Sequence, residues 1–126
     1  MAKILVLDDV ADAAVLVKRI MEKKGHEVSL FTDEEEALEY AGSCKMDLAI
    51  LDIKLKKMNG LKVLEALKKT DTSIHVIMLT GYPTLDTARE SLELGAEAYC
   101  VKPIDKVELE RQVEDILSGR ALPSSA

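Results

Sequence analysis

The type of fold is set near the start of the chain, where the sequence reads Lys3-Ile4-Leu5-Val6-Leu7-Asp8-Asp9. A continuous apolar run of this length predicts a strand that is buried on both faces. Two further runs have the same form: residues 48–51 lead into Asp52, and residues 74–79 lead into Thr80. Strands of this kind are typical of a parallel sheet that helices cover on both sides.

Amphipathic segments separate these strands. Residues 10–24 repeat apolar side chains at helical spacing, and Gly25 is expected to end that helix. Residues 27–31 alternate and residues 98–101 form a short mixed run, which predicts two strands at the sheet edges. Four more helices are expected to follow these capping residues: Asp33 (or Thr32), Asn59, Thr84 and Asp105.

Five strands and five helices therefore alternate strictly, and their crossovers are expected to be right-handed. We predict a flavodoxin-like (βα)5 fold of the α/β class, with a five-stranded parallel sheet in the order 2-1-3-4-5. The ligand site of such a fold lies beyond the carboxyl ends of strands 1 and 3. In the fourth helix, Leu85, Ala88 and Leu92 are expected to share one apolar face, and Gly119 is expected to close the last helix.

The composition narrows the class of protein. The chain has 126 residues, 48% of them apolar, which fits one domain with its own core. Its net charge of -6 disfavours binding to nucleic acid, and no apolar run approaches the roughly 20 residues of a membrane span. Cys44 and Cys100 form no CxxC motif, so we expect two reduced thiols in a cytoplasmic protein.

Polar side chains follow four of the predicted strands. Asp8 and Asp9 follow the first, Asp52 the third, Thr80 the fourth and Lys102 the fifth. Because parallel strands end at one edge of a sheet, these groups are expected to meet there. Three carboxylates in one cleft repel one another, so one is protonated, or Lys102 neutralises part of the charge, or a cation binds. A metal and a lysine around one carboxylate would also receive a phosphoryl group.

The sequence resembles the receiver domain of bacterial two-component response regulators over about residues 3–118. The resemblance rests on four segments in order: Ile4-Leu5-Val6-Leu7-Asp8-Asp9, Leu51-Asp52-Ile53 with Met58-Asn59-Gly60 downstream, Leu79-Thr80-Gly81, and Tyr99-Cys100-Val101-Lys102-Pro103. Each segment alone is weak, whereas their order and spacing together are specific. The receiver domain is expected to span residues 1–119, with a short flexible tail at 120–126.

The resemblance implies a role for each acidic residue. Asp52 would be the phosphoacceptor, becoming an aspartyl phosphate. Asp9, Asp52 and the backbone carbonyl of Lys54 would bind Mg²⁺ (or Mn²⁺) directly, and Asp8 would hold the metal through water.

The resemblance also implies a switch. Thr80 would hydrogen-bond the phosphoryl group and move inward, and the ring of Tyr99 would then swing from outside to inside. Lys102 would pair with a phosphoryl oxygen, its bond to Pro103 would be cis, and Gly81 would leave room for the phosphoryl group.

Two departures from the family pattern concern the loop after Asp52. The Met-Pro pair that is frequent there is replaced by Leu55 and Lys56, and the residue before Gly60 is Asn59 rather than an acid. In the family that the sequence resembles, the positions of Lys54 and Tyr82 border the path of the water that attacks the aspartyl phosphate. A bulky Tyr82 is therefore expected to shield it and to slow dephosphorylation.

A receiver of this kind takes its phosphoryl group from a sensor histidine kinase or a phosphotransfer protein. It catalyses only its own phosphorylation and slow dephosphorylation, so we do not expect an enzyme in the ordinary sense. The expected reader of the switched surface, made by the fourth helix, fifth strand and fifth helix, is a downstream protein, a fused output domain beyond Ala126, or a second copy of this chain.

Other functions stay open at this level. A Mg²⁺-dependent aspartyl phosphohydrolase usually has a second Asp two residues after its nucleophile, where this chain has Lys54. A receiver-like module that acts without phosphorylation would not need all five site groups. A ligand-binding flavodoxin-like module would need a phosphate-binding glycine loop after the first strand, which is lacking.

Overall fold

The computed structural model describes residues 2–55 and 59–119. Strands and helices alternate along the chain. The strands are β1 Lys3–Leu7, β2 Glu27–Phe31, β3 Leu48–Asp52, β4 His75–Thr80 and β5 Ala98–Val101. The helices are α1 Ala11–Lys23, α2 Glu34–Ser43, α3 Gly60–Thr70, α4 Leu85–Glu93 and α5 Lys106–Ser118. The predicted tail, the loop residues Lys56 and Lys57, and Met58 of the second motif lie outside the described residues.

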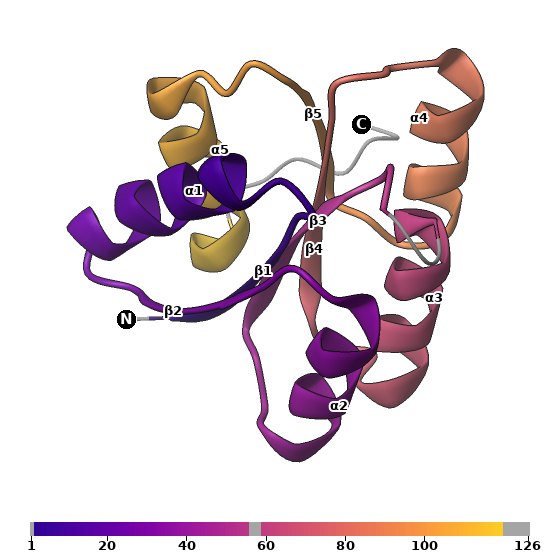
Figure 1. The fold of residues 1–126 in the computed structure, drawn as a ribbon, viewed down its shortest axis with the longest axis horizontal. Helices are drawn as coiled ribbons and strands as arrows, with labels where there is room; N and C mark the ends of the chain where they lie inside the picture. The colour runs from indigo at the N-terminus through magenta and orange to yellow at the C-terminus, as the bar shows by residue number, and fades with distance from the viewer. Residues whose placement is uncertain (1, 56–58, 120–126) are drawn as a thin grey trace.

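All five strands are parallel and lie in the order β2-β1-β3-β4-β5, which confirms the predicted topology (Figure 1). The register makes the strand ends level: Leu7 pairs with Leu51, and Asp52 pairs with Leu79. Thr80 in turn pairs with Val101, the residue before Lys102. The polar groups that follow these strands therefore leave the sheet side by side.

The sheet separates two apolar layers. Side chains such as Ile4 and Val6 of β1 pack toward α1 and α5, whereas the alternate residues Leu5 and Leu7 pack toward α2 and α3. Figure 1 shows the same division, with α1 and α5 on one side of the sheet and α2, α3 and α4 on the other. Burial on both faces explains why β1, β3 and β4 are continuous apolar runs.

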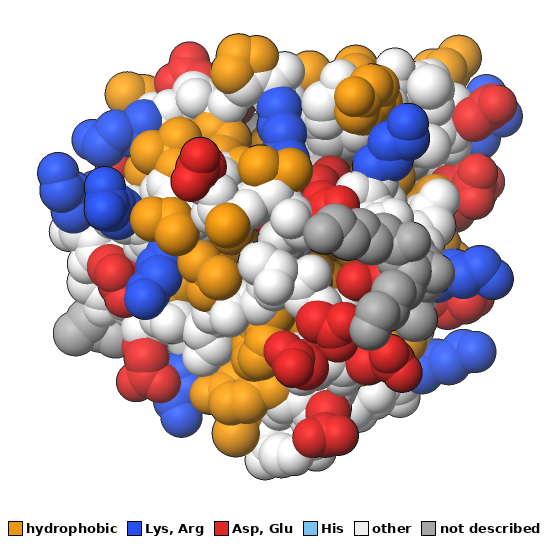
Figure 2. All heavy atoms as spheres, in the orientation of Figure 1, with side chains coloured by type: hydrophobic (Ala, Val, Ile, Leu, Met, Phe, Trp, Pro, Cys, Tyr) orange, Lys and Arg blue, Asp and Glu red, His pale blue; other side chains and the backbone are white. Residues whose placement is uncertain are grey.

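Four helices begin at the predicted capping side chains. Asp33, Asn59, Thr84 and Asp105 each accept a hydrogen bond from a backbone N–H in the first turn of the helix that follows. Gly119 ends α5 in the left-handed region, with φ 77°, a conformation that a residue with a Cβ adopts at a cost. Acidic side chains gather over α2, whose first turn carries Glu34, Glu35 and Glu36 and so complements the positive end of the helix (Figure 2).

The apolar face predicted for α4 is largely exposed. Leu85 and Leu92 are 76% and 44% exposed, and Ser91 is the buried residue of this helix. The physical reason is position: α4 packs beside α3 and β5, and β5 is the last strand of the sheet. Only one narrow side of the helix meets the core there. Within the described residues, no helix is long and apolar enough to cross a membrane.

Candidate functional site

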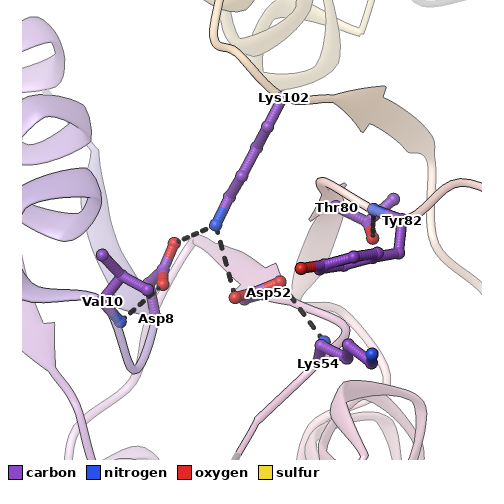
Figure 3. Close-up of polar contacts among 7 residues, drawn as sticks. All are labelled: Asp8, Val10, Asp52, Lys54, Thr80, Tyr82 and Lys102. Atoms are coloured by element: carbon purple, nitrogen blue, oxygen red, sulfur yellow. Dashed lines mark hydrogen bonds and ion pairs between the residues drawn. The ribbon is translucent and has the colours of Figure 1, made fainter.

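The carboxyl ends of the strands bring Asp8, Asp52 and Lys102 together, as predicted (Figure 3). Asp8 follows β1, Asp52 ends β3, and Lys102 follows β5. The Lys102 Nζ atom lies 2.8 Å from Asp8 Oδ2 and 3.3 Å from Asp52 Oδ2. One ammonium group thus bridges two carboxylates that come from sequence positions far apart.

Both carboxylates are buried; the residue exposures of Asp8 and Asp52 are 3% and 5%. Burial and the negative charge of Asp8 raise the pKa of Asp52, because both disfavour its charged form. The charge and hydrogen bond of Lys102 and the N–H of Lys54, which donates to Asp52 Oδ1 at 3.3 Å, act in the opposite direction but do not cancel this rise. Asp52 is therefore a carboxylate whose charge is incompletely compensated.

Lys102 shows the complementary effect. Burial alone would lower its pKa, but hydrogen bonds and attraction to Asp8 and Asp52 outweigh burial and raise the pKa. The shorter distance is the one to Asp8, so Asp8 receives the larger share of the positive charge. An additional cation would therefore be stabilised mainly by the negative charge of Asp52, which Lys102 compensates less fully than that of Asp8.

The residues present fit a hard divalent cation. Carboxylate oxygens of Asp8, Asp9 and Asp52 all lie within 4.8 Å of one another. Oxygen donors in a compact group of this kind suit Mg²⁺, which binds few carboxylates and keeps several waters. Asp9 is only partly buried, so an ion and its waters have access from solvent.

Thr80 and Gly81 lie on the opposite rim of the site. Thr80 is buried, and its Oγ1 atom accepts a hydrogen bond from the N–H of Tyr82 at 3.0 Å. A Cβ atom at Gly81 would lie 3.9 Å from the Cβ and Cδ atoms of Lys102, an ordinary contact. A small residue thus leaves the space beside the lysine stem open.

Lys54 and Tyr82 face each other across this opening. The Lys54 ammonium lies 4.2 Å from the centroid of the Tyr82 ring, a cation–π contact between the loops after β3 and β4 (Figure 3). These two side chains, with Asp9, Val10, Asp52, Gly81 and Lys102, line a hollow of about 290 Å³. The hollow gives Asp52 a way to solvent, and Tyr82 covers part of it.

Tyr99 lies away from the carboxylates, on β5. It is half-buried, and its hydroxyl group contacts Thr87 and Thr84 at the start of α4. The Lys102–Pro103 peptide bond is cis.

For Gly60 and Thr87, the sequence predicted no specific structural role, although both make important contacts. A Cβ atom at Gly60 would collide with the backbone of Asp52 and Ile53, so the start of α3 packs directly behind the central carboxylate. The Gly60 N–H also donates to the carbonyl of Ile53 at 2.7 Å. Thr87 carried no sequence signal, because its contact with Tyr99 joins α4 to β5 and follows no local pattern.

A flavodoxin-like sheet with acids, a hydroxyl and a lysine at its carboxyl edge defines a class of phosphate-handling α/β domains. The family model of the response regulator receiver domain matches residues 4–114, and the chain belongs to this family. It is a two-component signalling domain, and the alternatives left open by the sequence are not favoured.

Individual relatives agree with this assignment. Sporulation initiation phosphotransferase F of Bacillus subtilis (strain 168) is 34% identical over 115 residues, which cover 91% of this chain and 93% of the relative. The alkaline phosphatase synthesis transcriptional regulatory protein PhoP of the same organism is 37% identical over 98% of this chain, but this chain spans only 52% of PhoP. A solved CheY-like receiver domain from Methanospirillum hungatei JF-1 has a TM-score of 0.91 at 32% identity, with coverage of 95% and 96%.

Proposed function

We propose that Asp52 is the phosphoacceptor of this receiver domain. The observation that carries the proposal is the arrangement around Asp52: a buried carboxylate beside a second acid, with one shared lysine and an opening to solvent. The donor is a phosphohistidine of a sensor histidine kinase or of a phosphotransfer protein. A relative of which this chain covers 93% is named a phosphotransferase, which supports a phosphorelay role.

In the transfer, an ionised Asp52 oxygen forms a bond to phosphorus, and the bond between phosphorus and the histidine nitrogen breaks. The electron pair of the broken bond stays on the imidazole nitrogen. Lys102 reaches the Asp52 carboxylate already, so its ammonium is placed to pair with an oxygen of the arriving phosphoryl group. The Thr80 oxygen accepts the N–H of Tyr82, and its hydroxyl proton would be donated to another phosphoryl oxygen when Thr80 moves toward it.

Asp9, Asp52 and the backbone carbonyl of Lys54 would hold Mg²⁺ (or Mn²⁺), with Asp8 acting through water. When bound, the ion supplies positive charge that neutralises the phosphoryl oxygens and the acidic cluster. The support is the compact set of carboxylate oxygens and the uncompensated charge near Asp52.

Phosphorylation adds nearly two negative charges at this edge of the sheet, and Thr80 and Tyr99 would pass the change to the surface of α4, β5 and α5. That surface carries exposed Leu85, Leu92 and Val101, which suits recognition by a protein. The reader would be a downstream protein, a fused output domain or a second copy of the chain. The domain would comprise residues 1–119 and act in the cytoplasm. It would catalyse only its own phosphorylation and its own slow dephosphorylation.

The test is to incubate the protein with Mg²⁺ and acetyl phosphate and to measure the intact mass. We expect one added phosphoryl group, lost in Asp52→Asn and kept in Asp71→Asn, which removes a partly buried carboxylate at the amino end of the sheet. An adduct that survives Asp52→Asn would contradict the assignment. Steady turnover of many phosphate esters would favour a phosphohydrolase instead.

A further inference from the structure

The hydroxyl group of Tyr99 ties β5 to the start of α4. It lies 2.8 Å from Thr87 Oγ1, and it accepts a hydrogen bond from the N–H of Thr84 at 3.3 Å. In the part of the chain that the structure describes, both partners of this hydroxyl belong to the first turn of α4 and its cap. The hydroxyl of Tyr99 is therefore held by α4 and, among the described residues, by no group of the phosphoryl site.

The Thr87 hydroxyl lies at the centre of this group. Its Oγ1 atom lies 2.8 Å from the Tyr99 hydroxyl, 2.9 Å from Thr84 Oγ1 and 3.2 Å from the carbonyl oxygen of Thr84. A hydroxyl has one proton and two acceptor positions, so Thr87 can serve all three contacts at once. Loss of this hydroxyl would therefore remove the α4 side-chain partner of the Tyr99 phenol.

The hydrogen bonds with Tyr99 are important for α4 because this helix makes few buried contacts with the rest of the domain. It buries only Ser91, whereas α3 buries five residues, including Leu64 and Leu67. Helix α4 therefore depends more on polar contacts than its neighbour does. A change at Tyr99 would reach the start of α4 directly.

The same hydroxyl group also fixes one end of the segment that follows the phosphoryl site. This segment, residues 81–84, begins after Thr80, whose Oγ1 accepts from the N–H of Tyr82. It ends at Thr84, whose N–H donates to Tyr99. Each end is therefore held by one hydroxyl, and release of Thr80 toward a phosphoryl group would leave the Tyr99 end as the remaining restraint.

We propose that Thr87 is a positioning residue that holds Tyr99 in the conformation described here and so opposes the phosphorylation-linked switch. This inference rests on the proposed function. For Tyr99 to move together with Thr80, its hydrogen bond to Thr87 in α4 must break, and the binding of the phosphoryl group must supply the free energy for this.

The first experiment uses beryllofluoride with Mg²⁺ as a phosphoryl mimic and measures its affinity by calorimetry. Thr87→Val keeps the shape of the side chain and removes the hydroxyl, and we expect about fivefold tighter binding, the effect of one neutral hydrogen bond. Thr87→Ser should restore the native affinity. Thr70→Val is the matched control, because the Thr70 hydroxyl also donates to a helix carbonyl, that of Ala66, but far from the site.

The second experiment measures amide hydrogen exchange at Thr84 without phosphoryl group or mimic. We expect faster exchange in Thr87→Val, a larger increase in Tyr99→Phe, which removes the acceptor of the Thr84 N–H itself, and a native rate in Thr87→Ser. In the double variant Thr87→Val with Tyr99→Phe, the effect should not exceed that of Tyr99→Phe alone, since Thr87 acts on Thr84 through the Tyr99 hydroxyl.

The outcomes separate the two ideas. If the native protein binds no beryllofluoride, the proposed function fails and this inference with it. If the native protein binds but Thr87→Val binds equally or more weakly, or if Thr84 exchange stays native, only the role of Thr87 is overturned. A purely structural role for Thr87 would weaken the fold without tightening the binding of a phosphoryl mimic.

Discussion

The two ends of the sheet use the same kinds of residues in opposite ways. At the amino end, Asp47 accepts the N–H of Lys3 through its side chain at 2.8 Å and the N–H of His75 through its carbonyl at 3.1 Å. Nearby, Asp71 pairs with Lys45 at 3.2 Å and accepts from both the N–H and the hydroxyl of Ser73. Asp47 and Asp71 thus each have donors of their own.

At the carboxyl end, two buried acids share one lysine. The pKa values express the contrast: hydrogen bonds from Ser73 and Lys45 lower that of Asp71 to about 2, whereas burial and Asp8 raise that of Asp52. Asp47 and Asp71 at the amino end each have donors of their own, whereas Asp8 and Asp52 at the carboxyl end share one ammonium group, an arrangement that favours a further positive group. Four predictions test this difference.

The largest effect is expected from Lys102→Met. Among residues 2–55 and 59–119, Lys102 has the only ammonium group that pairs with Asp8 and Asp52, and its loss should slow phosphorylation by acetyl phosphate about 100-fold, the usual scale for a group that stabilises transferring charge. The rate is measured by intact mass over time. Lys45→Met removes an ion pair at the amino end and should leave the rate unchanged. An equal loss in both variants would show that the two ends do not differ.

The next effect concerns the packing behind Asp52. Gly60→Ala forces a Cβ atom against the backbone of Asp52 and should lower the free energy of unfolding by about 1–3 kcal/mol. Urea denaturation measures it. The control is Gly42→Ala in α2, where an added Cβ meets nothing within 4 Å and Ala favours the helix by up to about 1 kcal/mol. Equal midpoints for the two variants would refute the close packing.

A smaller effect is expected at the opening of the site. Tyr82→Ala removes the ring that Lys54 contacts and uncovers the hollow beside Asp52, so the phosphorylated form should hydrolyse severalfold faster. Loss of the adduct over time gives the rate. Tyr82→Phe keeps the ring and should keep the native rate. No acceleration in Tyr82→Ala would exclude shielding by this residue.

The smallest effect is expected at the amino end. Because the pKa of Asp71 is lowered in the folded protein, the ionised group stabilises the fold above its ordinary pKa of 3.8, and this stabilisation is lost as the pH falls toward about 2. Asp71→Asn should therefore lower the melting temperature slightly at pH 7. Calorimetry should show the gap between variant and native protein narrowing below pH 4. A gap that grows on acidification would reverse the assigned sign.

The sequence predicted the parts of this molecule that depend on local pattern or on strand direction. Continuous apolar runs identified β1, β3 and β4, and the caps at Asn59 and Asp105 marked helix starts. Parallel strands end at one edge, so the meeting of Asp8, Asp52 and Lys102 followed once the order was inferred.

Contacts between elements could not be predicted in this way. Helical spacing showed that Leu85 and Leu92 share a face, but not that this face would lie over the margin of the sheet. The same limit applies to Lys54 against Tyr82 and to Tyr99 against Thr87, since each contact joins two elements whose relative placement depends on packing.

Because α4 buries few residues, its sequence can diverge during evolution more freely than that of the other helices. Most of its surface, including Leu85, Arg89 and Leu92, can be replaced without disturbing the core, because only Ser91 is buried. Thr87, which contacts Tyr99, is not one of these exposed positions. Partner choice can therefore change at the exposed positions with little effect on phosphoryl chemistry, and a library of variants randomised there should yield folded receivers with new partners.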